Sequence, residues 1–345
     1  MKMRTLLLLA ASGLLPAVPA TAQTPPAAAT LDTAYVAGPF QVFTGAGAKA
    51  TLEDVVRAMG GVQVVFVGET HDDPTAHHLE LELLQRAQAA YGAGSAEPRP
   101  VALSLEFFER DAQLPLDEYL AGLVPESVLR TDARPWPRYQ TDYRPMVEFA
   151  KEQKLAVIAA NAPRRYVTMV ARRGRAALDE LGEQARTLLP PLPYPAASTS
   201  YRDQWIATIS RVMEMEGMKC GMPVAHAAAP PGAHGNMGNQ FDSQVLWDAS
   251  MAHAIARHLE AQPAALVLHM VGGFHVERGT GTPEQLAGYR PGTRALIVSL
   301  RPVEDIGAFQ PAPAGQWGDF VIQTEKSRTL EEIECRRIRA EQGRQ

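Results

Sequence analysis

Short apolar runs recur along the chain, and segments with helical periodicity separate them. Four runs are rich in aliphatic and β-branched residues and predict buried strands, at 62–67, 101–105, 156–160 and 264–270. Two later runs, 295–300 and 319–324, predict the last strands. Helical patterns cover 52–59, 75–90, 143–153 and 242–260, and the capping sequence Thr51-x-x-Asp54 precedes the first of them. This alternation predicts an α/β fold with a mainly parallel sheet flanked by helices.

A different composition interrupts this pattern between about residues 164 and 238. The segment begins rich in arginine, passes through Leu189-Pro190-Pro191-Leu192-Pro193 and contains a helical pattern at 201–216. It then ends in a loop of Gly, Pro, Met and His residues. We interpret it as a helical insertion or lid within a domain at 40–325, and a surface excursion is the alternative. Residues 326–345 are predicted to be a C-terminal tail.

The first 22 residues have the three parts of a secretory signal peptide. Lys2 and Arg4 precede an apolar run at 5–15, and Ala20-Thr21-Ala22 follows as a cleavage site. The run is shorter than the roughly 20 residues that a spanning helix needs, so we expect no transmembrane anchor in the mature chain. No cysteine lies near the cleavage site to carry a lipid. The expected location is the periplasm or cell envelope, with residues 23–39 as a disordered leader.

Composition narrows the class of partner. The 345 residues are 46% hydrophobic, which is enough for one large core and excludes a disordered tail. The net charge of −5 repels phosphate backbones, so no nucleic-acid partner is expected. The only cysteines are Cys220 and Cys335, and in an oxidising compartment they are either one disulfide or two free thiols.

Acids and imidazoles follow the predicted strands. The first strand runs into Glu69 and His71, the second into Glu106, the third into Asn161 and the fourth into His275. The carboxyl ends of parallel strands form the crevice in which ligands bind. Such groups cost desolvation energy unless they are paired or bound to an ion. A shared polar pocket is therefore predicted.

The sequence G-x-x-H occurs twice in this set, at Gly68–His71 and at Gly272–His275. Glu69 and His71 point the same way on an extended segment, so the carboxylate either tunes the imidazole or only fixes the loop. Glu106 has apolar neighbours and needs a partner, for which Arg144 or Arg164 is available.

Three further groups of side chains are candidate ligands, each with a structural alternative. His77 and His78 start a helix whose dipole is expected to keep an imidazole neutral and able to ligate a metal, unless they only form the first turn. Tyr139 and Tyr143 offer a tyrosinate for ferric haem, although Tyr143 also suits a helix entrance with Asp142 as N-cap. Soft ligands suited to copper(I) or haem iron, or to filling gaps in a core, gather at Met213, Met215, Met218, Cys220, Met222, His226, His234 and Met237.

Together these motifs resemble the ChaN-like haem-binding uptake proteins of the Tiki superfamily. The resemblance covers most of the chain from about 40 to 300. It is carried by six ordered blocks: Val64-Val65-Phe66-Val67-Gly68-Glu69-Thr70-His71, Leu105-Glu106-Phe107-Phe108-Glu109-Arg110, Tyr143-Arg144-Pro145-Met146-Val147-Glu148-Phe149-Ala150, Ala159-Ala160-Asn161-Ala162-Pro163-Arg164, Trp247-Asp248-Ala249-Ser250-Met251-Ala252 and Gly272-Gly273-Phe274-His275-Val276.

The resemblance implies an envelope protein that binds haem in iron uptake, with a tyrosine ligand to the iron at a homodimer interface. The cofactor-binding residues are then Tyr139 or Tyr143, with propionate partners among Arg138, Arg144, Arg164, Arg165 and Lys219. Members are often lipoproteins, and this chain lacks the anchoring cysteine.

The wider superfamily implies an alternative, because it also contains metal-dependent proteases and erythromycin esterase-like hydrolases. In that case a divalent metal ion replaces haem, and the catalytic and metal-binding residues are Glu69, His71, Glu106 and His275. A scaffold without catalytic activity, in which these residues form an inherited polar core, is the third interpretation.

Overall fold

The computed structural model describes residues 38–326 except 217, 220–221 and 224–235. Within this range, only the backbone is described at 211–216, 218–219 and 222–223. Our expectations for the signal peptide, both cysteines and the side chains of the Met/His loop before Met237 therefore lie outside the described residues, as do those for the leader before residue 38 and the C-terminal tail after residue 326. Among the helices that are described, none is both long and apolar enough to cross a membrane.

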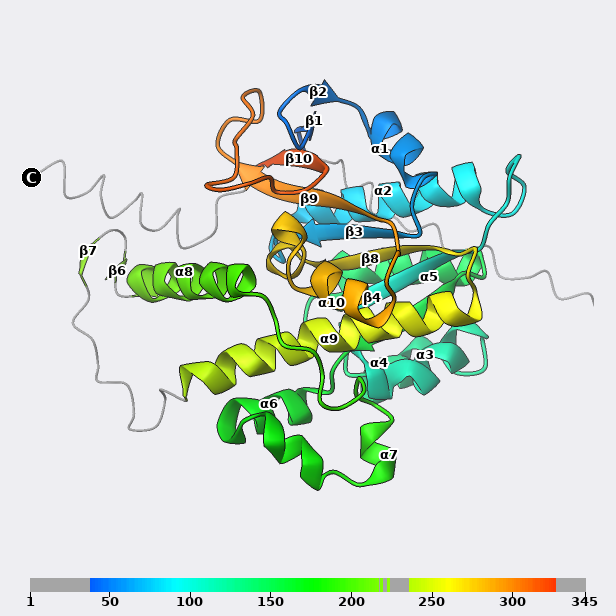
Figure 1. Cartoon of the computed structure of the whole chain (residues 1–345). Coiled ribbons are helices and arrows are strands. Elements are labelled where there is room, and N and C mark those ends of the chain that lie inside the picture. The colour runs from blue at the N-terminus through cyan, green and yellow to red at the C-terminus, as the bar shows by residue number, and fades with distance from the viewer. Residues whose placement is uncertain (1–37, 217, 220–221, 224–235, 327–345) are drawn as a thin grey trace, which may run out of the picture. The chain divides into compact units, whose positions relative to one another are not determined.

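An eight-stranded mixed sheet forms the centre of the fold, in the order β2-β1-β10-β9-β3-β8-β4-β5 (Figure 1). The six strands from β10 to β5 are parallel, and β1 pairs antiparallel with both β10 and β2. The predicted mainly parallel α/β fold is thus confirmed. The strands are β1 (Phe40–Thr44), β2 (Lys49–Ala50), β3 (Val64–Glu69), β4 (Val101–Glu109), β5 (Ala156–Asn161), β8 (Leu266–Gly272), β9 (Ala295–Val303) and β10 (Phe320–Glu325).

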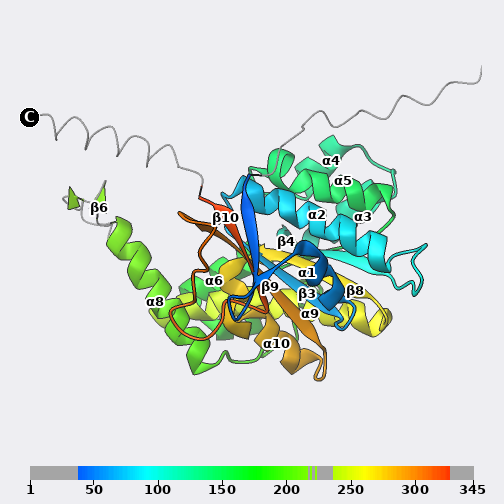
Figure 2. The ribbon, with the colours of Figure 1, turned by 90° about the horizontal axis from the view of Figure 1, so that it is seen from above.

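Helices cover both faces of the sheet, as Figure 2 shows from above. One face is covered by α1 (Leu52–Met59), α2 (Pro74–Tyr91), α3 (Gln113–Leu120), α4 (Glu126–Asp132) and α5 (Arg144–Glu152). The other is covered by α9 (Met237–Ala261) and α10 (Thr282–Tyr289). The insertion contributes α6 (Arg164–Arg173), α7 (Glu183–Arg186), α8 (Thr199–Glu216) and the short strands β6 (Met218–Lys219) and β7 (Met222–Pro223).

The burial of β3 explains why its apolar run is continuous. Val65 and Val67 belong to the core beneath α1, α2 and α5, whereas Val64 and Phe66 belong to the core beneath α9 and α10. A strand covered on both faces has no solvent side, so it needs apolar residues at every position. At the start of α1 the predicted capping box is present, because the Thr51 side chain and the Asp54 side chain each accept from the other's backbone N–H.

A third core joins the insertion to α9. Tyr201 and Trp205 of α8 pack around Phe241 at the start of α9, with ring centroids 5.8 and 5.5 Å from it. Leu189 and Tyr194, from the chain between α7 and α8, are buried in the same cluster. The insertion is therefore anchored to α9 through aromatic contacts.

Candidate functional site

The carboxyl ends of β3, β8 and β4 bring the four predicted acids and imidazoles together. Glu69 ends β3 and lies opposite Gly272, the last residue of β8. The Gly272 N–H donates to Glu106 Oε2 of β4 over 2.7 Å. A Cβ built on Gly272 would lie 2.8 Å from His71 Cε1 and 3.5 Å from Glu106 Oε2. Glycine is thus required for the His71 ring to lie against this strand end and beside Glu106.

Glu69 holds His71 at the solvent side of this cluster. Its Oε1 lies 2.6 Å from His71 Nδ1, and the Glu69 side chain is fully buried while that of His71 is 48% exposed. Burial lowers the pKa of His71, but the Glu69 hydrogen bond and the charges of Glu106 and Glu69 outweigh it, so the pKa is raised above the usual value. His71 therefore presents an accessible imidazole whose orientation is set from behind.

His275 is fixed by a buried acid from α9 rather than by β8. Its Nδ1 lies 2.8 Å from Asp248 Oδ1, and its Nε2 lies 3.6 Å from Glu106 Oε1. Burial opposes the charged imidazole, but Asp248 and Glu106 outweigh it and raise the pKa of His275 to about 9. Asp248 also accepts hydrogen bonds from Tyr201 at 2.7 Å and Thr282 at 2.9 Å. A protonated His275 is therefore expected at neutral pH.

The partner of Glu106 differs from our prediction. Its carboxylate oxygens face the Gly272 N–H and His275 rather than Arg144 or Arg164. Arg144 pairs with Glu126 at 2.8 Å and Glu148 at 3.6 Å, and Arg164 is exposed at the start of α6. The backbone satisfies this acid because β8 lies directly beside β4.

A second group of acids lies behind Glu69, around His77 of α2. His77 Nδ1 is 3.1 Å from Glu69 Oε2 and 3.2 Å from Glu80 Oε2, and its Nε2 is 3.5 Å from Asp142 Oδ2. We expected the helix dipole to lower the pKa of His77, and this was wrong. Burial does lower it, but Glu80, Glu69 and Asp142 outweigh the burial and raise the pKa to about 9.

This group contains donors for a metal ion. Three side chains each offer one ligand atom, namely those of Glu69, His77 and Glu80, and these atoms lie within 4.8 Å of one another. All three residues are buried. Glu80 Oε1 is buried without a hydrogen-bond partner, whereas Glu69 Oε2 and Asp142 Oδ2 make ion-pair contacts with His77 and Arg138. Burial, and then the charge of Glu69, raise the pKa of Glu80. Of the four residues predicted to bind a divalent metal in a hydrolase, only Glu69 belongs to this triad, together with the further candidate His77.

The two candidate tyrosines lie in different surroundings. Tyr143 stacks on Phe107 with ring centroids 3.6 Å apart, and its hydroxyl lies 3.3 Å from Glu69 Oε1. Tyr139 instead lines a surface pocket of about 430 Å³ with Arg130, Pro135, Trp136 and Pro137. Its hydroxyl is buried and has no hydrogen-bond partner. Burial is the largest cause that raises the pKa of each tyrosine above the usual range.

Trp136 connects this pocket to the polar cluster. Its ring packs edge-on against the His71 ring with centroids 4.9 Å apart, and it also lines the Tyr139 pocket.

The remaining predicted propionate partners are paired with acids or lie where only the backbone is described. Arg138 pairs with Asp142 at 2.6 Å and Arg165 pairs with Asp111. Lys219 lies in β6, where only the backbone is described. Met237, the one residue of the Met/His loop with a described side chain, is 48% exposed.

Sequence reasoning did not assign roles to Asp248, Glu80 or Tyr201. Two of them, Glu80 and Asp248, could have been identified from their positions in the sequence. Glu80 lies three residues after His77, on the same helical face, and Asp248 is a single acid among the buried residues of α9. Asp142, expected as an N-cap, instead pairs with Arg138 and His77.

Residues 55–286, more than half of the chain, match the profile of the haem-binding uptake family of the Tiki superfamily, ChaN. The chain belongs to this family. Among solved structures, ChaN of Campylobacter jejuni, described with cofacial haem binding, is similar with a TM-score of 0.60 and 15% identity. The similarity covers 83% of this chain and 97% of that one, and at this identity it shows the ChaN-like fold alone.

Two further similarities are weaker. Protein RETICULATA-RELATED 5, chloroplastic, of Arabidopsis thaliana is 26% identical over 248 residues, which cover 70% of this chain. This chain spans 31% of the length of that relative. The structure of the type III effector HopBA1 is similar with a TM-score of 0.43 and 13% identity, covering 80% of this chain and 94% of that one.

Proposed function

We propose that this protein binds haem in the service of iron uptake and that Tyr139 is the iron ligand. Membership of the ChaN family supports haem as the ligand. The observation that carries the choice of residue is the Tyr139 hydroxyl, which is buried without a partner in a residue that lines the 430 Å³ pocket. A buried polar group without a partner is costly, and a bound cation removes that cost.

The residues around this pocket fit a haem. Pro135, Trp136 and Pro137 provide an apolar wall for the macrocycle, and the exposed Arg130 provides a cation for a propionate. Burial opposes the phenolate form of Tyr139, Glu126 and Glu148 act in the same direction, and a ferric ion would supply the positive charge that stabilises it. Arg144 is unsuited as a propionate partner because Glu126 and Glu148 already neutralise it.

Tyr143 is the matched control for this assignment. It lies on the same turn as Tyr139 and is buried to the same degree, but its hydroxyl faces the Glu69 carboxylate, which opposes loss of its proton. Haemin titration of the purified protein should give a ferric tyrosinate spectrum that Tyr139→Phe removes and Tyr143→Phe keeps. A spectrum lost only in Tyr143→Phe would reverse the assignment, and no binding by the wild type would refute haem as the ligand.

Export and dimerisation complete the proposal. We expect removal of residues 1–22 in the periplasm, and a mature chain whose first residue is Gln23 by mass spectrometry would support it. A full-length chain retained in the cytosolic fraction would contradict export. Haem-dependent dimerisation, measured by analytical ultracentrifugation, would support a shared haem interface, and an unchanged monomer would contradict it.

A second function, hydrolysis, is favoured by the convergence of Glu69, His71, Glu106 and His275. Glu69 orients His71, whose half-exposed imidazole is placed to exchange a proton with water. Asp248 holds His275 protonated, so it would stabilise negative charge that develops on a substrate oxygen. Nothing in haem binding through Tyr139 requires this arrangement.

Turnover of a panel of simple esters separates the two functions. For hydrolysis, His71→Ala and His275→Ala should abolish turnover while Tyr139→Phe leaves it unchanged. The ferric haem spectrum should be lost in Tyr139→Phe and kept in His71→Ala and His275→Ala. If purified wild-type protein turns over none of the esters in the presence or absence of Mn²⁺ or Zn²⁺, ester hydrolysis is excluded.

A further inference from the structure

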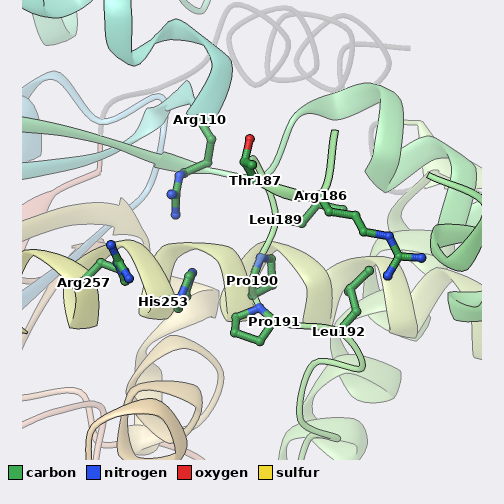
Figure 3. Close-up of a pocket in the computed structure, with 9 residues that line it drawn as sticks. All are labelled: Arg110, Arg186, Thr187, Leu189, Pro190, Pro191, Leu192, His253 and Arg257. Atoms are coloured by element: carbon green, nitrogen blue, oxygen red, sulfur yellow. The ribbon is translucent and has the colours of Figure 1, made fainter. Parts of the chain in front are cut away.

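A second pocket lies away from the acidic site, between α9 and the chain that follows α7 (Figure 3). Its volume is about 440 Å³, and none of its lining residues belongs to the polar cluster at the strand ends. Four of those residues carry cationic or ionisable nitrogen groups, namely Arg110, Arg186, His253 and Arg257. An apolar wall is formed by Leu189, Pro190 and Pro191. The pocket is therefore electropositive on one side and apolar on the other.

Arg110 is the central group of this pocket. It follows the end of β4, and in Figure 3 its guanidinium points toward α9. Its Nη1 is buried and has no hydrogen-bond partner, and no ion pair involves Arg110 among the described residues. Burial, and then the charge of Arg257, lower the pKa of Arg110. A desolvated guanidinium without a counter-charge is costly, and an anionic ligand offsets that cost.

His253 and Arg257 lie one turn apart on α9 and therefore on the same face. His253 Nδ1 is buried without a partner, and the ring packs against Tyr289 with centroids 5.3 Å apart. Burial lowers the pKa of His253 to about 4, and the charges of Arg110 and Arg257 act in the same direction, against Glu260. The imidazole is thus neutral in the free protein, and a bound anion would favour its protonation.

Arg186 also lines the pocket but is already used. Its guanidinium donates to the carbonyl oxygens of Leu181 at 2.8 Å and Asp179 at 2.7 Å, and Figure 3 shows it pointing away from Arg110. The Thr187 hydroxyl likewise donates to the carbonyl of Gln184 at 2.7 Å. The donors left for a ligand are those of Arg110, His253 and Arg257, and the only ion pair that involves any of them among the described residues is the exposed 3.9 Å contact of Arg257 Nε with Glu260.

We propose that this pocket binds the phosphate group of a small molecule, held by Arg110, His253 and Arg257. Two guanidinium groups and an imidazole supply separate donors to the oxygens of one tetrahedral group, whereas a carboxylate needs only one guanidinium for its two oxygens. A phosphate dianion also supplies enough charge to compensate both arginines. The apolar wall would contact the organic part of a phosphate monoester.

Isothermal titration calorimetry of the whole protein at low ionic strength tests this site, with inorganic phosphate, glycerol 3-phosphate and acetate as probes. We expect one saturable site per chain for both phosphates and none for acetate. Arg110→Gln and the surface variant Arg257→Ala should each weaken phosphate binding by about tenfold or more. Arg172→Ala, an exposed arginine of α6 outside the pocket, is the control for the loss of one charge.

The outcomes divide the alternatives. Tighter binding of glycerol 3-phosphate than of inorganic phosphate assigns a monoester, and equal binding assigns the phosphate ion itself. Acetate binding as tight as phosphate, no saturation, or equal weakening in Arg172→Ala would each overturn the proposal. Proton uptake on binding, measured in two buffers of different ionisation enthalpy and lost in His253→Gln, would place the anion against the imidazole. Uptake unchanged in His253→Gln would remove His253 from the site.

Discussion

The buried histidines His275 and His77 each lie among acids, and the two networks differ in how completely those acids are satisfied. Around His275, Asp248 receives hydrogen bonds from His275, Tyr201 and Thr282. Around His77, Glu80 Oε1 has no hydrogen-bond partner, while Glu69 Oε2 and Asp142 Oδ2 are paired with His77 at 3.1 Å and Arg138 at 2.6 Å. The first network is complete and positions a group, whereas the second has a spare acceptor for a proton or a metal ion.

The comparison is tested most strongly at Asp248. Replacing it in Asp248→Ala leaves His275 and Tyr201 buried without their acceptor, so we expect a loss of about 3–5 kcal/mol in the free energy of unfolding. Urea denaturation measures it. The matched variant Asp248→Asn keeps the shape and one acceptor oxygen and should lose less. Equal stability of Asp248→Ala and wild type would show that the network contributes nothing.

The second largest expected effect is the change in the free energy of unfolding with pH. The pKa values of His275 and His77 are raised from 6.5 to about 9, so the stabilisation is fully present below about pH 6.5 and is lost as pH rises through 9. Each shift corresponds to about 3 kcal/mol. The raised pKa of Glu80 acts in the same direction, because ionising this buried acid disfavours folding.

Urea denaturation between pH 6 and 9.5 checks this expectation. His275→Gln and His77→Gln should each flatten the profile, and the double variant should flatten it further. A wild-type profile that rises over this range would show that the two imidazoles are neutral in the folded protein.

Metal addition separates the two networks, because the His77 group contains Glu80 Oε1, a buried carboxylate oxygen without a hydrogen-bond partner. Mn²⁺ bound to Glu69, His77 and Glu80 should raise the free energy of unfolding by about 2.7 kcal/mol at a hundredfold excess over its dissociation constant. The gain should increase with pH because the metal displaces protons. Thermal unfolding with and without Mn²⁺ measures it. Glu80→Gln should remove the gain, while Asp248→Asn should keep it.

The smallest expected effect is at Gly272, between the two networks. The Cβ of Gly272→Ala meets the half-exposed His71 ring, which is able to shift, so we expect a stability loss of only about 1 kcal/mol. The displacement moves His71 away from Glu106, so its titration, followed by NMR, should shift toward the value of an isolated imidazole. An unchanged His71 titration would show that the ring does not rest on this strand end.

The strand ends could be predicted from sequence because burial leaves a strong pattern. The continuous apolar run of β3 ends at Glu69, and parallel strands bring their ends to one edge of a sheet, so the convergence of Glu69, Glu106 and His275 follows from topology. The short edge strands β1 and β2 were missed because pairing with β10, rather than a long apolar run of their own, defines them.

The partners within the site were harder to predict. The choice of the Gly272 N–H over an arginine as partner of Glu106 depends on β8 lying between β3 and β4, and strand order is not visible in local patterns. The pKa of His77 is raised first by Glu80 on the same helix and then by Glu69 and Asp142, which lie in other elements. A helix dipole is a local effect, and three nearby carboxylates exceed it.

The position of β8 also has a consequence for biogenesis. β3 and β4 follow each other along the chain, yet β8, which is synthesised much later, separates them in the sheet. A ribosome that has released only the first two-thirds of the polypeptide therefore holds two strands that are not native neighbours. High contact order of this kind slows folding and exposes incomplete edges to chaperones or to aggregation. The strand ends acquire their final arrangement only when this late segment inserts.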